Sequence, residues 1–403
     1  MAILSVNIGS SSLKFSIHRF HDRMVDSAWV SGSLQGLEPG GQVSLCWTLE
    51  GHTHRETLAE ADSDPFARAI QRLREWLSAL PGLPPLLAIS HRVVHGGAHY
   101  SEAVLSTPEV IATLESLNSL APLHQPHNLA GVKALTKAFP GLPQILCFDT
   151  AFHASVPSLH QRFALPRALH DQGVRRYGFH GLSYQYILQT LQQHSSRAQQ
   201  RLLLAHLGNG ASLCAVQAGR SLATTMGFSA LDGLMMGTRS GTLDPGVLLY
   251  LLEQGWSHDR IQKLLYKESG LLGVSGLSAD MRRLRASQEP PVQEALALFT
   301  HRVVRESGAM IACLQGLDVM AFSGGIGEHD ALLRADVCRS LSWLGVRIDA
   351  QRNLEALGET VCALHTPDSS IEVWVVPTDE GRVAAQEALA WLERHPTSHS
   401  TAA

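Results

Sequence analysis

The sequence predicts an α/β protein built from two copies of one α/β unit, and three observations lead to this prediction. Short apolar runs with the spacing of strands alternate with helical stretches along the whole chain. A Gly- or Ser-rich turn follows a strand near the start of each half, and sliding the chain by 200 residues sets Ser12-Leu13 on Ser212-Leu213. The chain has 403 residues, which is enough for two to three domains of about 150 residues each.

The first half opens with an apolar run at 2–7, a turn at 9–12 and a strand in which Phe15 and Ile17 alternate with polar residues. Asp64 before Pro65 is typical of a helix N-cap, and Pro81-Gly82 ends that helix. The other elements predicted for this half are strands at 43–49, 86–90 and 144–148 and helices at 108–117 and 129–139.

The second half repeats the order of strand, Gly-rich turn and strand. Asp244-Pro245 is predicted to open a helix, and a closing helix is predicted to follow Glu380. The other elements predicted for this half are strands at 201–207, 212–216, 319–322 and 373–376 and a helix at 291–314.

Composition excludes several classes of protein. The net charge of −4 gives no basic excess to neutralise nucleic-acid phosphates, so no nucleic-acid partner is expected. No apolar run approaches the ~20 residues of a membrane helix, and the N-terminus lacks the basic start of a signal peptide. The six cysteines are scattered without a CxxC pair, which is typical of buried thiols in a reducing compartment. We therefore expect a cytoplasmic protein without a membrane partner.

The first turn could bind phosphate. Three serine hydroxyls at 10–12 and free backbone N–H groups can surround phosphate oxygens, and Lys14 adds a positive charge. Asn7, at the end of the preceding strand, can offer an amide oxygen to a metal or its water. An ordinary hairpin with a Ser-rich turn is the alternative for this segment alone.

Other chemistry-bearing residues follow strands of the first half. Arg92, in the string His-Arg-Val-Val-His-Gly-Gly, can fork onto a carboxylate or phosphate, and a structural arginine is the alternative. The oxyanion loop of a lipase-type hydrolase is excluded because the chain has no GxSxG elbow. Asp149 ends an apolar strand, where open α/β sheets bind ligands, or it caps the next segment. His180 lies between glycines ahead of a helix.

The second half carries two Gly-rich turns after strands, at 206–210 and 323–328. Neither matches GxGxxG or GxxxxGK[ST], so the Rossmann and P-loop interpretations fail. Arg239 lies in a loop bracketed by glycines, and Glu380 lies where a carboxylate could hold a cation. Two arginines, a lysine, a histidine, two carboxylates and several Gly-rich turns are together what phosphoryl transfer from a magnesium–nucleotide requires.

The whole set resembles the acetate kinase family, within the superfamily of acetate and sugar kinases, heat-shock chaperones and actin. The resemblance runs from Ile3 to about Ala385. Its motifs occur in the family's order: Asn-x-Gly-Ser-Ser-Ser-x-Lys, His-Arg-Val-Val-His-Gly-Gly, Phe-Asp-Thr-Ala-Phe-His, Tyr-Gly-Phe-His-Gly, His-Leu-Gly-Asn-Gly and Met-Gly-Thr-Arg-Ser-Gly.

The resemblance implies two duplicated actin-like (ribonuclease H-like) domains of mixed β-sheet flanked by helices, with an active-site cleft between them. The N-terminal domain would comprise 1–150, completed by the C-terminal helix in 381–403, and 151–380 would bind the nucleotide. The resemblance also implies a homodimer, acetate and ATP as substrates, and magnesium as cofactor, for which manganese can substitute.

The resemblance assigns roles by position. Asp149, His180 and Arg239 match catalytic positions, and Asn7 and Glu380 match the magnesium positions. Arg92 matches the acid-binding arginine, with Val94, Leu123 and Phe179 lining a small apolar acid pocket. The nucleotide-binding positions are Ser10, Ser12, Lys14, His206, Leu207, Gly208, Asn209, Gly210, Asp280, Met281, Arg282, Gly324, Gly325, Ile326, Gly327 and Glu328.

The chain departs from the family pattern at three positions. Gln125 replaces an asparagine, His329 replaces an asparagine next to the nucleotide stretch, and Ala230 stands where a pocket proline is common. The smaller Ala230 would widen the acid pocket, and one methylene is worth only ~1–3 kcal/mol of discrimination. A propionate or butyrate kinase of the same family is therefore the alternative.

The chemistry of the acid limits the role of Asp149. An aliphatic acid has a pKa near that of Glu, ~4.3, so it is ionised at neutral pH and needs no general base. We expect Asp149 to orient magnesium or its water, and a role in proton transfer stays open. A non-catalytic nucleotide switch of the actin or chaperone kind is a further alternative, but such a switch would need no second anion site.

Overall fold

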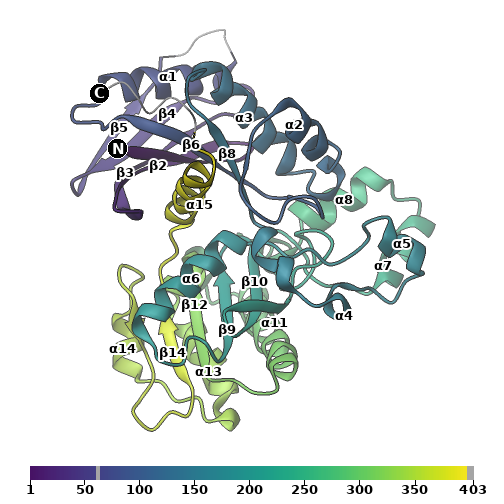
Figure 1. The fold of residues 1–403 in the computed structure, drawn as a ribbon. Helices are drawn as coiled ribbons and strands as arrows, with labels where there is room; N and C mark the ends of the chain where they lie inside the picture. Colours follow the sequence, from purple (N-terminus) through teal and green to yellow (C-terminus); the bar gives the residue numbers. More distant parts are fainter. Residues whose placement is uncertain (60–63, 397–403) are drawn as a thin grey trace. The chain divides into compact units, whose positions relative to one another are not determined.

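The computed structural model describes residues 1–59 and 64–396. The chain forms two compact units (Figure 1): unit 1 comprises Met1–Ala151 with Asp379–Ala403, and unit 2 comprises Phe152–Thr378. Residues 397–403 of the predicted N-terminal domain lie outside the described residues. Glu380, which the predicted boundary left with the nucleotide-binding domain, lies in unit 1. No helix in the described ranges is long and apolar enough to cross a membrane.

Unit 1 contains an eight-stranded mixed sheet in the order β5-β4-β3-β2-β1-β6-β8-β7. The strands are β1 (Ala2–Ile8), β2 (Ser12–His21), β3 (Met24–Gln35), β4 (Ser44–Leu49), β5 (His52–Thr57), β6 (Leu86–Val93), β7 (Val104–Leu105) and β8 (Gln144–Phe148). The strands β1, β6 and β8 run parallel, whereas the other neighbouring pairs are antiparallel. The carboxyl ends of the three parallel strands therefore share one edge of the sheet.

Helices cover both faces of this sheet. Its helices are α1 (Pro65–Ala79), α2 (Pro108–Glu115), α3 (Gln125–Ala138) and α15 (Glu380–Arg394). Asp64 caps α1 as predicted, because its carboxylate accepts hydrogen bonds from two backbone N–H groups of the first turn. Leu73 and Trp76 of α1 pack with Leu4 and Phe15 of the sheet. On the other face α15 contacts β1, β6 and β8.

Unit 2 contains a six-stranded mixed sheet in the order β11-β10-β9-β12-β14-β13. The strands are β9 (Arg201–Leu207), β10 (Ala211–Gln217), β11 (Arg220–Thr224), β12 (Val319–Ser323), β13 (Cys362–Ala363) and β14 (Glu372–Val375). This sheet repeats β3-β2-β1-β6-β8-β7 of unit 1 strand for strand, with the same parallel and antiparallel pairs. The predicted duplication of one α/β unit is confirmed.

The residues that suggested the repeat are not themselves equivalent. Ile8 pairs with Leu13 across a turn of four residues, whereas Leu207 pairs with Ala211 across a turn of three. The position in unit 2 that corresponds to Leu13 is therefore Ala211. The match of Ser12 with Ser212 was a coincidence of sequence inside a true structural repeat.

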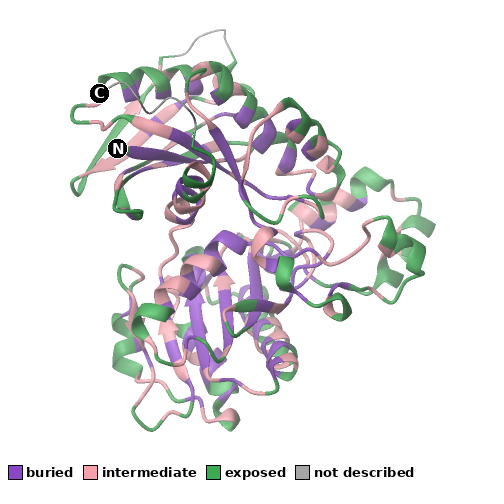
Figure 2. Cartoon of the chain, viewed as in Figure 1, coloured by how far each residue is buried: buried purple, intermediate pink, exposed green. Residues whose placement is uncertain are grey.

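Two helices of unit 2 sandwich its sheet. Its helices are α4 (Ser158–Gln161), α5 (Arg167–Asp171), α6 (Gly181–His194), α7 (Pro245–Glu253), α8 (His258–Lys267), α9 (Gly270–Ser275), α10 (Met281–Arg285), α11 (Pro290–Leu314), α12 (Gly324–His329), α13 (Ala331–Ser340) and α14 (Ala350–Glu355). Tyr184, Ile187 and Leu191 of α6 pack on Leu202 and Leu204 of β9. The long helix α11 contacts β9, β10 and β11. In Figure 2 the exposed colour dominates the segment that carries α5 and α7.

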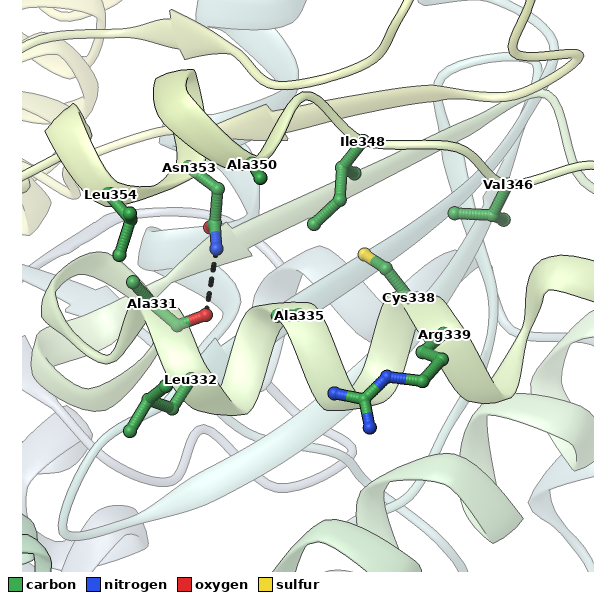
Figure 3. A pocket seen from close by; sticks show the side chains of 10 residues that line it. All are labelled: Ala331, Leu332, Ala335, Cys338, Arg339, Val346, Ile348, Ala350, Asn353 and Leu354. Atoms are coloured by element: carbon green, nitrogen blue, oxygen red, sulfur yellow. Dashed lines mark hydrogen bonds between the residues drawn. The ribbon is translucent and has the colours of Figure 1, made fainter.

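A fully buried arginine joins three helices of unit 2. The Arg334 guanidinium on α13 donates to the carbonyl oxygens of Gly327 and Glu328 at the end of α12 (2.9 and 2.7 Å). It also donates to Asn353 and Ala356 at α14. Burial lowers the pKa of Arg334. In Figure 3, Asn353 donates to the carbonyl of Ala331 beside a cavity of about 330 Å³.

We expect Arg334→Met to destabilise unit 2 by about 3 kcal/mol, because the substitution leaves several buried carbonyl oxygens without donors. Urea unfolding followed by tryptophan fluorescence measures the change. Arg339→Met is the matched control: the Arg339 side chain lies on the same helix, is 74% exposed and, among residues 1–59 and 64–396, pairs with Asp336 alone. We expect the control to change stability by less than about 0.5 kcal/mol, and equal losses for both variants would contradict the role of Arg334.

Candidate active site

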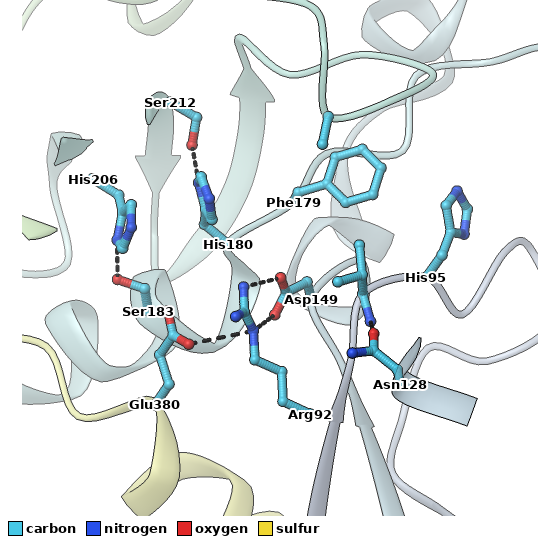
Figure 4. Close-up of polar contacts among 12 residues, drawn as sticks. Arg92, His95, Asn128, Asp149, Phe179, His180, Ser183, His206, Ser212 and Glu380 are labelled. Carbon is cyan, nitrogen blue, oxygen red and sulfur yellow. Dashed lines mark hydrogen bonds and ion pairs between the residues drawn. The ribbon is translucent and has the colours of Figure 1, made fainter. Parts of the chain in front are cut away.

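Unit 1 brings one arginine and two carboxylates together at the carboxyl ends of its parallel strands. Arg92 lies near the end of β6, Asp149 follows β8, and Glu380 is the first residue of α15. The Arg92 guanidinium donates through Nε to Asp149 Oδ1 (2.9 Å) and through Nη2 to Asp149 Oδ2 (2.6 Å). Arg92 Nε also lies 3.3 Å from Glu380 Oε2 (Figure 4). The sequence predicted each residue separately, and the fold places all three in one cluster.

Charge compensation keeps Arg92 ionised. The side chain of Asp149 is only 2% exposed, and that of Arg92 is 20% exposed. Burial alone would lower the pKa of Arg92, but the carboxylates of Asp149 and Glu380 outweigh it and raise that pKa above its ordinary value. Asp149 occupies the Nε and Nη2 edge of the guanidinium. Among residues 1–59 and 64–396, none accepts a hydrogen bond from Nη1, so that group can meet a second anion.

The predicted phosphate turn forms the hairpin between β1 and β2. Gly9 donates its N–H to the carbonyl of Ser12 (2.8 Å), which closes the turn and leaves Ser10 exposed. Asn7 and Lys14 are directly opposite in the antiparallel ladder, so their side chains lie on the same face of the sheet. An amide oxygen and an ammonium group are thus neighbours at this end of the strands.

The oxygen donors of unit 1 suit a magnesium ion that also takes ligands from phosphates and water. Within the described ranges, no three His, Cys, Asp or Glu side chains form a group that could hold a metal alone. Magnesium at kinase sites is usually bound by one or two carboxylates plus substrate phosphates. Asp149 and Glu380 contact the same guanidinium, so the two carboxylates lie close together. The donor set therefore fits magnesium brought by a nucleotide.

The loop after Arg92 is held by buried amide side chains. The backbone N–H of Val94 donates to Asn128 Oδ1 (3.0 Å), and the N–H of His95 donates to Gln125 Oε1 (3.1 Å). Gln125 Nε2 donates back to the carbonyl of His95 (2.9 Å). Gln125 is completely buried, so this departure from the family pattern shapes the loop from inside.

Unit 2 contains a cavity of about 1010 Å³ where the resemblance places the nucleotide. Of the predicted nucleotide-binding residues it is lined by Gly208, Asn209, Asp280, Met281, Arg282, Gly325 and Ile326, and also by His329. The parallel strands β9 and β12 end side by side there, since His206 pairs with Ser323. Gly324 has a φ of +74°, and a Cβ at this position would lie 2.8 Å from the carbonyl oxygen of Leu207. Only glycine allows the two turns to approach so closely.

Other residues that were predicted to bind the nucleotide make structural contacts within unit 2. The Glu328 carboxylate accepts hydrogen bonds from the N–H groups of Gly324 (2.8 Å) and Thr378 (3.1 Å), so it holds the second Gly-rich turn. Asp280 caps α10 and pairs with the side chain of Arg282, which lowers the pKa of Asp280 to about 2. Leu207 and Gly327 are buried beneath the turns.

His180 and Arg239 approach the first Gly-rich turn from the same side. A Cβ on Gly210 would lie 3.2 Å from His180 Nε2 and 3.6 Å from Arg239 Nη2. Arg239 Nη1 donates to the carbonyl oxygen of Ala230 (2.8 Å), so the departure at Ala230 directly adjoins a predicted catalytic group. His180 has a left-handed φ of 60° at the N-cap of α6, a strained conformation of the kind found at functional sites.

Two imidazole rings stack beside the same turn. The ring centroids of His180 and His206 are 4.2 Å apart, with an interplanar angle of 28°. His180 Nδ1 is hydrogen-bonded to Ser212 Oγ (2.9 Å) and His206 Nδ1 to Ser183 Oγ (2.8 Å), as Figure 4 shows. Sequence analysis did not assign Ser183 or Ser212 a role, because their partners come from distant segments.

The residues predicted for the acid pocket belong to different units. Val94 is buried and Leu123 is half-buried in unit 1, whereas Phe179 is buried in unit 2. Asn128 was missed by sequence analysis. A signal for it existed, because Asn128 shares the buried face of α3 with Val132 and Leu135 at helical spacing, where an amide is unusual.

Comparisons with known proteins match nearly the whole chain. The model of the acetokinase family matches residues 2–386. An acetate kinase of Rhodopseudomonas palustris is 48% identical over 389 residues, which cover 95% of this chain and 96% of the relative. An acetate kinase of Rickettsia prowazekii is 39% identical and covers 97% of this chain and 99% of the relative.

Two solved structures have a fold similar to that of this chain. The crystal structure of Porphyromonas gingivalis acetate kinase has a TM-score of 0.86 and 34% identity, with 97% of this chain and 99% of that chain covered. A propionate kinase from Francisella tularensis has a TM-score of 0.88 and 34% identity, with 96% and 98% covered. The family match over nearly the whole chain, together with these relatives, shows that the chain belongs to the acetokinase family.

Proposed function

We propose that this chain transfers the γ-phosphoryl group of ATP to acetate reversibly, giving acetyl phosphate and ADP. The observation that carries the proposal is the Arg92 guanidinium, which can meet an anion through Nη1 while Asp149 takes its other edge, and the cavity of unit 2 would hold the nucleotide. A nucleotide switch would need the cavity alone. The names of the relatives agree with this assignment.

Arg92 would bind the acid and aim it. The carboxylate of acetate is ionised at neutral pH, so the nucleophile needs no general base. Asp149 is engaged by both Nε and Nη2 of Arg92, which makes it a group that orients the guanidinium. Acetate would take the Nη1 side, where the fork geometry supports two hydrogen bonds to a carboxylate.

Unit 2 would bind ATP and stabilise the transferring group. The base and ribose would occupy the cavity beside 280–282 and Gly325, and the phosphates would follow the turn at 208–210. Arg239 and His180 would then meet negative charge on the equatorial oxygens in a loose, in-line transition state. By resemblance to the family, Ser10, Ser12 and Lys14 would also donate to phosphate.

Magnesium, when bound with the nucleotide, supplies positive charge to the phosphate oxygens and fixes their orientation. We propose that Asn7, Glu380 and Asp149 hold the ion or its waters. Arg92 compensates the charge of both carboxylates. A cytoplasmic location remains a prediction from the sequence.

Propionate is the second candidate substrate, because Ala230 adjoins Arg239 and a solved relative of 34% identity is a propionate kinase. We expect purified enzyme with ATP, magnesium and hydroxylamine to form acyl hydroxamate from acetate, and from propionate with a kcat/KM lower by about tenfold. Colorimetric hydroxamate assay with acetate, propionate and butyrate measures this. A preference for propionate or butyrate would replace the first candidate, and slow ATP hydrolysis without acid dependence would support a nucleotide switch.

The two arginines should affect different kinetic constants. We expect Arg92→Ala to raise the KM for acetate at least tenfold, since it removes a charge-assisted contact to the acid. We expect Arg239→Ala to lower kcat about 100-fold or more with a smaller effect on both KM values. Steady-state kinetics with each substrate varied distinguishes them, and Arg305→Ala, an exposed arginine on α11, is the control. Changes in the KM for ATP alone, in both variants, would contradict the assignment.

We further propose that α7 carries the interface of a homodimer. This helix has the sequence PGVLLYLLE, yet none of its residues is buried within the chain. Leu249, Tyr250 and Leu252 are 62%, 58% and 52% exposed. A continuous apolar helix surface of this kind usually marks a protein–protein contact.

We expect the double variant Leu249→Arg/Leu252→Arg to be monomeric at concentrations where the unmodified chain is dimeric, because two buried guanidinium groups would face an apolar surface. Size-exclusion chromatography with light scattering measures the mass. Trp343→Arg is the control, because Trp343 is 74% exposed on another part of unit 2. A monomeric unmodified chain, or a dimeric double variant, would contradict the proposed interface.

A further inference from the structure

The ring nitrogens of the two stacked histidines that face the Gly-rich turn are both Nε2. A Cβ on Gly208 would lie 3.8 Å from His206 Nε2, and one on Gly210 would lie 3.2 Å from His180 Nε2. In a neutral imidazole, Nε2 is either an N–H donor or a lone-pair acceptor, depending on the tautomer. The hydrogen bond at Nδ1 decides between them.

A buried tyrosine stands behind the serine that holds His180. Tyr184 OH and Ser212 Oγ share a hydrogen bond, and both residues have no exposed surface. Burial raises the pKa of Tyr184 well above its ordinary value, so the phenol keeps its proton. Among the described residues, Ser212 Oγ is the side-chain oxygen within hydrogen-bond distance of the phenol, and a buried phenol proton needs such an acceptor. The phenol proton is therefore available for Ser212.

The direction of the next bond follows from the donors and acceptors. If Tyr184 donates to Ser212 Oγ, the serine has one proton of its own to place. Among the residues that the structure describes, Ser212 Oγ bonds only Tyr184 OH and His180 Nδ1. A buried hydroxyl proton without an acceptor is costly, so Ser212 donates to Nδ1. His180 Nδ1 is then the acceptor, and the ring proton is on Nε2.

We propose that Tyr184 and Ser212 form a hydrogen-bond relay that holds His180 as a neutral Nε2–H donor aimed at the Gly208–Gly210 turn. Both are positioning residues, since they act through His180. The proposal rests on the function proposed above, in which His180 contacts the transferring phosphoryl group. The opposite tautomer would direct a lone pair at the phosphoryl oxygens and repel them.

The stacking geometry explains why His180 donates as a neutral imidazole protonated at Nε2 and not as an imidazolium cation. Two imidazolium cations with centroids 4.2 Å apart would repel each other, and Arg239 already places a cation beside Gly210. A fixed neutral donor avoids that repulsion and keeps its hydrogen bond to phosphate. Ser183 holds His206 Nδ1 in a similar way, but no further hydrogen bond of Ser183 in the described ranges sets the direction there. The inference is therefore confined to His180.

Nitrogen NMR of the histidine rings tests the relay directly. In the full-length enzyme labelled with ¹⁵N-histidine, we expect His180 to show a protonated Nε2 and an unprotonated Nδ1, with its signals identified by their loss in His180→Asn. In Tyr184→Phe, which removes only the phenol oxygen, we expect a mixture of both tautomers. Tyr186→Phe, on the same helix without a hydrogen bond of its hydroxyl in the described residues, should leave the signals unchanged.

Kinetics provides a separate measure of the consequence. We expect Tyr184→Phe to lower kcat about tenfold while the KM values for ATP and acetate change less than twofold, because binding is intact and the donor is only partly populated. Ser212→Ala should have a similar or larger effect. Its control is Ser307→Ala, another fully buried serine, whose hydroxyl has no partner among the described residues.

The outcomes separate the relay from the proposed function. A protonated Nδ1 in the unmodified enzyme, or an unchanged tautomer in Tyr184→Phe, would overturn the relay whatever the kinetics show. The expected NMR result with unchanged kcat would leave the relay standing and remove His180 from the proposed chemistry. If Ser212→Ala does not fold, the spectra of the unmodified enzyme and of Tyr184→Phe still decide.

Discussion

Parallel pairing of the central strands determines where the candidate functional groups lie. In each unit three parallel strands end at one edge of the sheet, and the residues that follow them point into the same region. In unit 1 this constraint brings Arg92 to Asp149, although they are 57 positions apart in the sequence. In unit 2 it sets the turns after β9 and β12 side by side. The duplicated fold thus provides two equivalent edges, which the chain uses for different tasks.

The two sheet edges differ in the charged groups that they carry. Unit 1 contains an arginine that would be costly to bury alone, and two carboxylates compensate it while leaving one amino group available. Unit 2 instead surrounds the turn at 208–210 with a cavity and two stacked imidazoles, and Arg239 is the cation beside it.

Sequence patterns predicted those features that local interactions decide. The cap at Asp64, the hairpin turns and the strands ending at Leu207 and Phe148 depend on neighbouring residues, and these predictions were confirmed. The hydrophobic and capping patterns of the sequence did not predict two features. One is β3, whose exposed and buried residues do not alternate regularly, and the other is the start of α3 at Gln125, where His124 makes no side-chain cap. The contacts of Arg334, Gln125 and Ser212 join segments far apart in the chain, so no local pattern could indicate them. The motifs of the site could be recognised in the sequence because glycine and charged residues directly follow the strands.

The helix α15 has a consequence for how the protein is made. It covers one face of the unit 1 sheet, yet all of unit 2 (Phe152–Thr378) precedes it in the chain. A ribosome adding ~5–20 residues per second needs roughly 10 to 45 s to cross that interval. During this time the strands of unit 1 lack their last helix, and Arg92 lacks the carboxylate of Glu380. Unit 1 is therefore begun first, but its sheet receives its last helix only after the whole of unit 2 has been synthesised.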